Sequence, residues 1–327
     1  MDDIYKPFIN YHGVKKCLRD LSELECSSNV FPGFFNKLSH VCHGLRSLKI
    51  YFYDSISNEL VKFVSVQKNL KNLHLQFHFM EQSLPFTKFP NSLTRLHIDG
   101  GNFHMPWSLI SELSNLQELS FYNKNSDLKD FENLQYAIFP QLEILKFECV
   151  CPEDEYLFKF LENNGKNLRK LFLCENIDGS VNSDIGTFCT NLKYLRTILP
   201  DGDVESLKVI FNGCKQLESI EILRCDCCDF FLDERKLLEI VVEFSPKFFY
   251  KLTVNLGIHV YPETTFKWEL KSILKRWANR EPCIPLFLKI TLLSEKVIEF
   301  SNSNFRIISE YKRSGVIHDF KIINLGK

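Results

Sequence analysis

The chain has 327 residues, of which 45% are hydrophobic and 25% are charged, a globular composition that excludes a wholly disordered protein. Lys and Arg number 40 against 41 Asp and Glu, so the formal net charge of -1 provides no chain-wide field for nucleic acid or an anionic membrane. The sequence has no signal-peptide pattern and no run approaching the ~18 apolar residues of a membrane span. We therefore expect a soluble protein of the cytoplasm or nucleus, with neither nucleic-acid nor membrane partners.

A short pattern, Leu-x-x-Leu-x-apolar, recurs along most of the chain. A single copy arises by chance in about one window in ten at this composition, so one copy alone would mean little. Successive first leucines, however, are 24, 25, 23, 23, 26, 26, 24 and 25 residues apart, within the 20 to 29 residues of leucine-rich repeats. These first leucines are Leu21, Leu45, Leu70, Leu93, Leu116, Leu142, Leu168, Leu192 and Leu217.

Each triplet predicts a short strand whose leucines share one face, because alternate side chains of a strand point the same way. Between the triplets, residues 55–66, 154–161 and 203–211 are predicted to be helical. Alternating strands and helices predict an α/β fold, a leucine-rich-repeat solenoid with a curved parallel sheet inside and helices outside. Leu119 and Leu171 should be buried in this solenoid, whereas their strand neighbours Ser120 and Lys170 should be exposed.

The period fades toward the C-terminus. The next triplet begins only at Phe249, 32 residues after Leu217, and an amphipathic helix is predicted from Phe266 to Trp277. Residues 283–293 and 317–323 are predicted to form two further strands. We expect an N-terminal cap segment at 1–20, a repeat solenoid at 21–256 and a capping region at 257–327, which would cover the apolar end of the sheet.

Several repeats have a cysteine three residues before the first leucine, namely Cys42, Cys189 and Cys214. Together with segments such as Lys-Asn-Leu-Arg-Lys-Leu at 166–171, these cysteines resemble the cysteine-containing repeats of F-box/leucine-rich-repeat proteins, above all the fungal members. In that family the F-box docks on the SCF ubiquitin-ligase adaptor and the repeats hold the substrate that is degraded. The resemblance does not include the F-box, for which residues 1–20 are too short, so we expect adaptor binding only if an F-box lies elsewhere.

No motif in the sequence indicates catalysis, since phosphate-binding glycine loops and the common hydrolase and kinase signatures are missing. We therefore expect a protein that is not an enzyme and has no cofactor. The cluster Cys225, Cys227 and Cys228 would suit zinc if cysteines such as Cys149, Cys151 or Cys174 lay nearby, but its spacing favours reduced thiols and no metal. His74 and His97 hold the same position in consecutive strands, where surface contact residues are favoured over metal ligands.

The concave sheet face is the predicted binding surface for a protein partner, because residues between the inward leucines project there as a grid. Aromatic and apolar groups exposed together on a rigid surface indicate an interface. The same side chains would be hidden if the C-terminal region covered them. Phe172, Tyr194, Ile198 and Leu223 should form a more apolar patch in the later repeats. The predicted contact residues are Tyr51, His74, His97, Asp99, Tyr122, Phe172, Tyr194, Arg196, Ile198 and Leu223.

Two functions remain open from the sequence. The first is a protein-recognition module of the substrate-receptor type found in ubiquitin-dependent degradation. The second is a stand-alone regulatory or inhibitory repeat protein without a ubiquitin-ligase link. In both cases we expect a monomer. A further basic surface lies along the predicted C-terminal helix, where a solvated face is favoured over a partner contact, at Lys267, Lys271, Lys275, Arg276 and Arg280.

Overall fold

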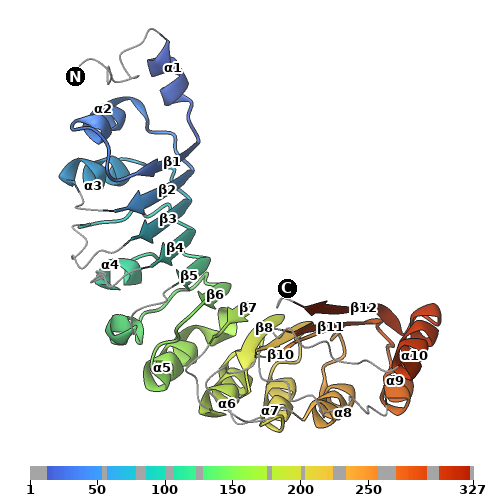
Figure 1. The fold of residues 1–327 in the computed structure, drawn as a ribbon. Helices are drawn as coiled ribbons and strands as arrows, with labels where there is room; N and C mark the ends of the chain where they lie inside the picture. The colour runs from blue at the N-terminus through green and yellow to red at the C-terminus, as the bar shows by residue number, and fades with distance from the viewer. Residues whose placement is uncertain are drawn as a thin grey trace. The chain divides into compact units, whose positions relative to one another are not determined.

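The computed structural model (Figure 1) divides into two compact units, residues 1–164 and 165–327. Each unit is described by itself. The structure describes residues 13–53, 57–78, 86–100, 107–122, 128–174, 179–199, 203–223, 233–256, 270–292 and 302–324.

The first unit contains six strands in parallel, each hydrogen-bonded to the next in chain order. Its helices lie together on one side of the strands (Figure 1). The strands are β1 (Glu23–Ser27), β2 (Ser47–Phe52), β3 (Asn72–Phe77), β4 (Arg95–Asp99), β5 (Glu118–Tyr122) and β6 (Ile144–Phe147). The helices are α1 (Val14–Arg19), α2 (Phe34–Val41), α3 (Asn58–Ser65), α4 (Trp107–Ser111), the 3-10 helix η2 (Lys129–Leu134) and α5 (Asp154–Asn164).

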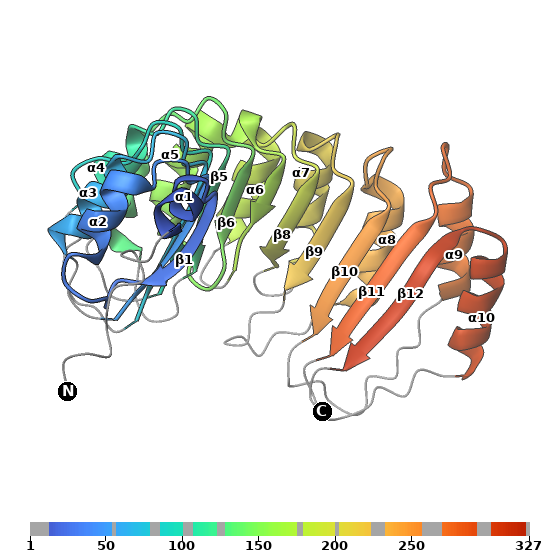
Figure 2. The ribbon, with the colours of Figure 1, turned by 90° about the horizontal axis from the view of Figure 1, so that it is seen from above.

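The second unit repeats this arrangement. Figure 2 shows strands β8 to β12 side by side, with helices α6 to α9 behind them. The strands are β7 (Lys170–Phe172), β8 (Tyr194–Ile198), β9 (Ser219–Leu223), β10 (Lys251–Leu256), β11 (Leu286–Leu292) and β12 (Ile317–Asn324). The helices are η3 (Gly165–Asn167), α6 (Gly179–Phe188), α7 (Ser206–Gly213), α8 (Glu234–Phe244), α9 (Leu270–Ala278) and α10 (Asn302–Arg313).

The repeated leucines explain why the strands stack. In the first unit the second leucine of each triplet is aligned across the sheet, as the register places Leu73 beside Leu96 and Leu96 beside Leu119. These three side chains are 0% exposed, because they point from the strands toward the helices. The predicted α/β leucine-rich-repeat solenoid is confirmed, including the burial of Leu119 and Leu171.

The cysteines three residues before the first leucine lie where a helix ends and the chain turns toward the next strand. The main-chain N–H groups of Cys42 and Cys214 donate to the carbonyls of Leu38 and Ile210, and so close the last turns of α2 and α7. Cys42, Cys189 and Cys214 are fully buried. In these three repeats the cysteine fills the buried space as a small apolar side chain.

The C-terminal strands continue the same parallel sheet after the sequence period has faded. β11 pairs with β10 on one side and with β12 on the other, both in parallel. The predicted amphipathic helix begins at Leu270, and its buried face consists of Leu270, Ile273, Leu274 and Trp277; Phe266 lies outside the described residues. None of the described helices combines the length and the apolar character that a membrane span requires.

Candidate functional site

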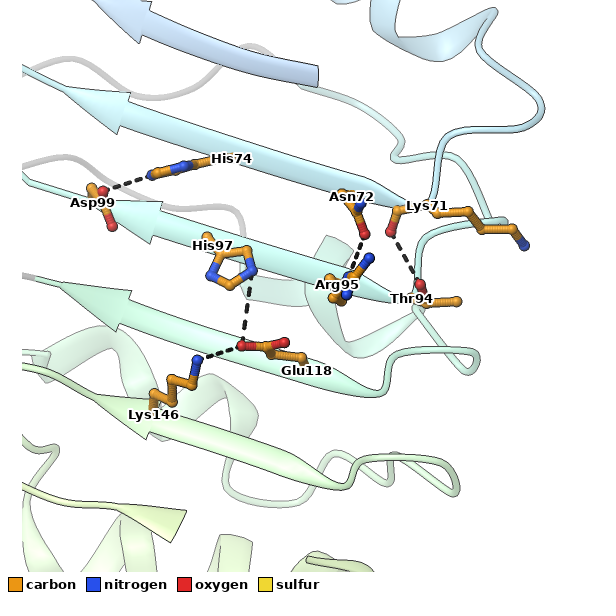
Figure 3. Close-up of polar contacts among 9 residues, drawn as sticks. All are labelled: Lys71, Asn72, His74, Thr94, Arg95, His97, Asp99, Glu118 and Lys146. Carbon is orange, nitrogen blue, oxygen red and sulfur yellow. Dashed lines mark hydrogen bonds and ion pairs between the residues drawn. The ribbon is translucent and has the colours of Figure 1, made fainter. Parts of the chain in front are cut away.

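Each sheet has one face that packs on helices and one that no described helix covers, which we call the open face. Side chains from alternate strand positions reach the open face. In the first unit they form the histidine cluster, defined as His74, His97, Asp99, Glu118 and Lys146 (Figure 3). In the second unit they form the aromatic cluster, defined as Phe172, Tyr194, Arg196, Glu221 and Asn255.

Strand register brings the histidine cluster together. His74 of β3 lies beside His97 of β4, and Asp99 follows two residues later on the same face. Glu118 begins β5 and Lys146 lies near the middle of β6, two strands from His97. The strands hold all five side chains in fixed positions on a surface that the helices leave free.

The histidine cluster is a chain of polar contacts that crosses four strands (Figure 3). His74 Nε2 lies 2.6 Å from Asp99 Oδ2, and the two imidazole rings are 5.7 Å apart between centroids. Glu118 Oε1 accepts a hydrogen bond from Lys146 Nζ at 2.6 Å and lies 3.9 Å from His97 Nε2. Glu118 thereby joins the second imidazole to the lysine.

The environment of His97 disfavours its charged form. Burial lowers the pKa of the imidazolium below 6.5, and the positive charges of His74 and Lys146 act in the same direction. The carboxylates of Glu118 and Asp99 oppose this effect, but the net shift of the pKa is downward. A neutral His97 ring both donates and accepts a hydrogen bond, so it can read polar groups of a partner.

Two predicted contact residues flank the histidine cluster in the first unit. The Tyr51 hydroxyl donates to the Glu25 carboxylate of the neighbouring strand, and the Lys49 ammonium lies 4.7 Å from the Tyr51 ring centroid. Tyr122, at the end of β5, is 38% exposed, so its ring can contact a partner directly. Both tyrosines extend the open face beyond the histidines.

The aromatic cluster is built from four consecutive strands, β7 to β10. The register aligns Phe172 of β7 with Arg196 of β8 and Arg196 with Glu221 of β9. The Phe172 and Tyr194 rings are 4.7 Å apart between centroids, and the Arg196 guanidinium lies 5.2 Å from the Phe172 ring centroid. Stacking of a guanidinium on an aromatic ring fixes both groups without removing them from the surface.

Glu221 holds the aromatic cluster in place. Its carboxylate accepts hydrogen bonds from the Tyr194 hydroxyl at 2.5 Å, from Arg196 Nε at 3.1 Å and from Asn255 Nδ2 at 2.9 Å. Burial raises the pKa of the Glu221 carboxyl, but the hydrogen bonds from Tyr194, Asn255 and Arg196 together with the Arg196 charge outweigh burial, so the net pKa is lowered. Burial, followed by the hydrogen bond to Glu221, raises the pKa of the Tyr194 phenol. Glu221 therefore stays ionised and keeps its three donors oriented.

Two expectations about the open face are wrong in detail. Ile198 is only 2% exposed, and its neighbours Thr197 and Leu199 are also buried, because the inside-outside alternation ends where β8 ends. Ser120 is 6% exposed, since it lies between the longer side chains of His97 and Lys146 in the strand register. The predicted apolar patch is accordingly a network of aromatic, cationic and anionic groups, with Leu223 half-buried at its edge.

Four participants were not among the predicted contact residues, namely Glu118, Lys146, Glu221 and Asn255. Alignment of the repeats by their leucines places Lys146 in the same column as His97, and Glu118 in the column of Arg95. Asn255 belongs to β10, which the fading period made hard to align. Writing the ten triplets beneath one another would have found all four, since the register also aligns Glu221 with Arg196.

Metal binding receives little support from the described part of the chain. Within it, no three His, Cys, Asp or Glu side chains are arranged to hold a metal ion. His74 and His97 instead contact separate carboxylates. Cys225, Cys227 and Cys228 lie outside the described residues.

Comparison with known proteins shows likeness in fold only. No family model matches the chain, and no curated protein matches it. A leucine-rich-repeat protein of Leptospira interrogans is 17% identical, with 90% of this chain and 83% of that chain covered and a TM-score of 0.42. LegL7, a leucine-rich-repeat-containing protein of Legionella pneumophila, is 14% identical, with 89% and 90% covered and a TM-score of 0.44.

A third solved structure, the Rad7 and Elc1 complex in yeast, contains a chain that is 14% identical to this one. The comparison covers 95% of this chain and 82% of that chain, with a TM-score of 0.49. Similarities at this level do not identify a function, so the functional argument rests on the open faces themselves.

Proposed function

We propose that this chain is a protein-recognition scaffold that binds a partner through the open faces of its sheets, and that it carries out no catalysis. The observation that supports this most directly is the aromatic cluster. It presents two aromatic rings and an arginine on a sheet face that no described helix covers. Aromatic and arginine side chains are the residue types that contribute most binding energy at protein interfaces.

Preorganisation makes the aromatic cluster suited to binding. A partner that meets Arg196 need not order its side chain, because Glu221 and the Phe172 ring already hold the guanidinium. Ordering one long side chain at an interface costs about 0.5–1.5 kcal/mol, and here the fold has ordered it beforehand. The strand backbone fixes the spacing of the side chains in the same way.

The histidine cluster supports the same function with different chemistry. It offers imidazoles, carboxylates and an ammonium in one network, which suits polar recognition and fixes the register of a partner. Together with Tyr51 and Tyr122 it provides an amphipathic surface in the first unit. We propose that both clusters contribute contacts to the partner. We also propose that the chain is a monomer and that it works in the cytoplasm or nucleus.

Affinity purification of the tagged chain followed by mass spectrometry identifies the partner, and variants then test the site. We expect the combined change of Phe172, Tyr194 and Arg196 to Ala to weaken partner binding at least tenfold while the far-ultraviolet circular dichroism is unchanged. The matched control is Lys62→Ala on α3, an exposed position on the helical side, which should bind normally. Normal binding by the triple variant together with loss of binding by the control variant would contradict the proposal.

The resemblance to F-box/leucine-rich-repeat proteins supports one version of this function, a substrate receptor for ubiquitin-dependent degradation. A stand-alone regulatory or inhibitory protein is the other version. The half-life of the purified partner in cells separates them. Depletion of this chain should lengthen that half-life in the first case, whereas an unchanged half-life with intact binding supports the second.

A further inference from the structure

Three lysines surround one phenylalanine on the open face of the last three strands. Lys251 of β10 lies beside Phe287 of β11, and its ammonium is 5.4 Å from the Phe287 ring centroid. Lys321 of β12 brings a second ammonium to 5.6 Å from the same ring. Lys289 lies two residues after Phe287 on the same face of β11. We call Lys251, Phe287, Lys289 and Lys321 the lysine cluster.

The charges of the lysine cluster are only partly balanced within the chain. Lys289 and Lys321 are directly opposite each other in the register, and like charges in that relation are destabilising. Lys321 Nζ is 3.4 Å from Asp319 Oδ2, but the same carboxylate also accepts from Lys312 Nζ at 2.9 Å. Among the described residues, Lys251 and Lys289 have no carboxylate within ion-pair distance.

The lysine cluster also lies where a partner can reach it. Figure 2 shows β10, β11 and β12 as a broad sheet with helices α8 and α9 behind it. Leu252, Leu288 and Ile290 point toward those helices and are buried, so the alternating positions that hold the lysines point away from them. Phe287 is half-buried and offers apolar area between the ammonium groups.

We infer that the lysine cluster binds an extended acidic segment of a partner protein, in which an apolar residue lies between two acidic residues. The acidic side chains pair with Lys251 on one side and with Lys289 and Lys321 on the other, and the apolar side chain packs on Phe287. This inference deepens the proposed function and rests on it, because it names the chemistry of the partner.

The spacing of side chains in an extended peptide supports an acidic segment as the ligand of the lysine cluster. Neighbouring strands lie about 4.8 Å apart, and alternate side chains of an extended peptide are about 6.6 Å apart on one face. A segment of five residues, with acidic residues at its first and fifth positions and an apolar residue at its third, therefore presents all three side chains on one face toward the three strands. Carboxylates there relieve the repulsion between Lys289 and Lys321.

The observations favour an acidic peptide over a nucleic acid. A phosphate backbone prefers an extended basic groove, whereas the lysine cluster spans only three strands. The net charge of -1 provides no wider positive field. Single-stranded DNA is therefore the competing ligand in the test.

Fluorescence anisotropy tests the inference on the full chain without the natural partner. The probe is a fluorescein-labelled synthetic peptide in which Asp-Ser-Leu-Ser repeats between Gly-Ser ends, so that Asp and Leu share one face when the peptide is extended. A peptide with Asn in place of Asp and labelled oligothymidylate are compared with it. We expect saturable binding of the acidic peptide that weakens as sodium chloride rises, and at least tenfold weaker binding of both comparison ligands.

The variant Lys251→Gln, Lys289→Gln, Lys321→Gln should bind the acidic peptide about tenfold more weakly, since each exposed ion pair contributes a modest amount. Changing the same three lysines to Arg retains the charge and should retain binding, which separates charge from misfolding. The matched control removes the same charge elsewhere, by changing Lys62, Lys271 and Lys275 to Gln, all exposed positions on helices.

Undiminished binding by the Lys251, Lys289, Lys321 variant, an equal loss in the matched control, or tighter binding of oligothymidylate would each overturn the inference. These results are distinguishable from failure of the proposed function. That proposal depends on capture of a natural partner and on Phe172, Tyr194 and Arg196, none of which enters the peptide assay.

Discussion

A buried asparagine at the end of α5 provides a sharp test of how neighbouring repeats are joined. Asn164 is 0% exposed, and its side chain bonds to the loop that precedes β6. Its Oδ1 accepts from the main-chain N–H of Phe139 at 2.7 Å, and its Nδ2 donates to the carbonyls of Ala137 at 2.9 Å and Phe160 at 3.0 Å. Asn164→Ala removes all three bonds while the main chain keeps its path.

The expected loss of stability follows from the main-chain groups that Asn164→Ala leaves without a hydrogen-bond partner. An unsatisfied buried polar group lowers the free energy of unfolding by about 1–3 kcal/mol. Phe139 is fully buried, so the loss of the acceptor for its N–H has this full effect. The carbonyl of Ala137 is only part-buried and adds less, while alanine regains up to about 0.7 kcal/mol of helix propensity. We therefore expect Asn164→Ala to lower the free energy of unfolding by about 2–3 kcal/mol.

The neighbouring residue is a matched control. Asn163 is the same residue type at the same helix end, but its side chain is exposed and donates to Gln135 O at 3.2 Å and Lys159 O at 3.0 Å. Asn163→Ala should change stability by no more than about 0.5 kcal/mol. Urea unfolding followed by circular dichroism measures both variants, and equal losses of stability at the two positions would refute the reasoning.

Two further predictions concern stability. Leu119→Ala and Leu171→Ala should each lower the free energy of unfolding by ~2–5 kcal/mol, since both side chains are fully buried and their removal leaves cavities. Lys170 is exposed, so Lys170→Ala should change the free energy of unfolding, measured in urea, by no more than ~0.5 kcal/mol. Similar losses at all three positions would contradict the assignment of inward and outward strand positions. The folded chain holds the His97 pKa below 6.5, so the unfolded chain takes up the proton first and stability falls as pH drops below about 6.5. The melting temperature of His97→Gln should depend less on pH over this range than that of wild type, and an unchanged dependence would contradict the shift.

The sequence predicts the fold well because the leucine period is a packing requirement. Leu73 points inward and has to pack beside Leu96, which in turn packs beside Leu119. The leucine positions within each repeat therefore specify the repeat length, the strand positions that point inward and the face of the sheet that is buried. Beyond Phe249 that signal weakens, yet β11 and β12 extend the sheet, because a strand with one buried face needs apolar residues at alternate positions and not leucine at fixed intervals.

The open face is harder to predict from sequence, since no core requirement constrains it. Alternation identified Phe172, Tyr194 and Arg196 as neighbours, and the register agrees. It placed Ile198 on the same surface, although the strand ends there and the side chain is buried. The role of Glu221 depends on three donors from neighbouring strands, which no pattern within one repeat contains.

The cysteine position illustrates how one packing problem is solved by different residues. Gln67 lies three residues before Leu70, where other repeats have cysteine, and its Nε2 donates to the carbonyl of Cys42 at 2.7 Å. In a later repeat the Cys214 thiol donates to the carbonyl of Ile185 at 3.6 Å. Both side chains therefore satisfy a carbonyl of the preceding repeat, and the cysteines are structural groups that pack between turns.

This structural role predicts how the thiols react. Burial raises the pKa of the Cys189 thiol well above its usual range and that of Cys214 to about 12, so neither forms the reactive thiolate near neutral pH. Cys17 and Cys283 are exposed. Iodoacetamide labelling of the native protein, mapped by peptide mass spectrometry, should modify the two exposed thiols and leave Cys189 and Cys214 unmodified until urea unfolds the chain. If Cys189 or Cys214 reacts in the native protein as fast as Cys283, the turns between repeats open readily, and the interpretation of these cysteines as fixed packing groups is wrong.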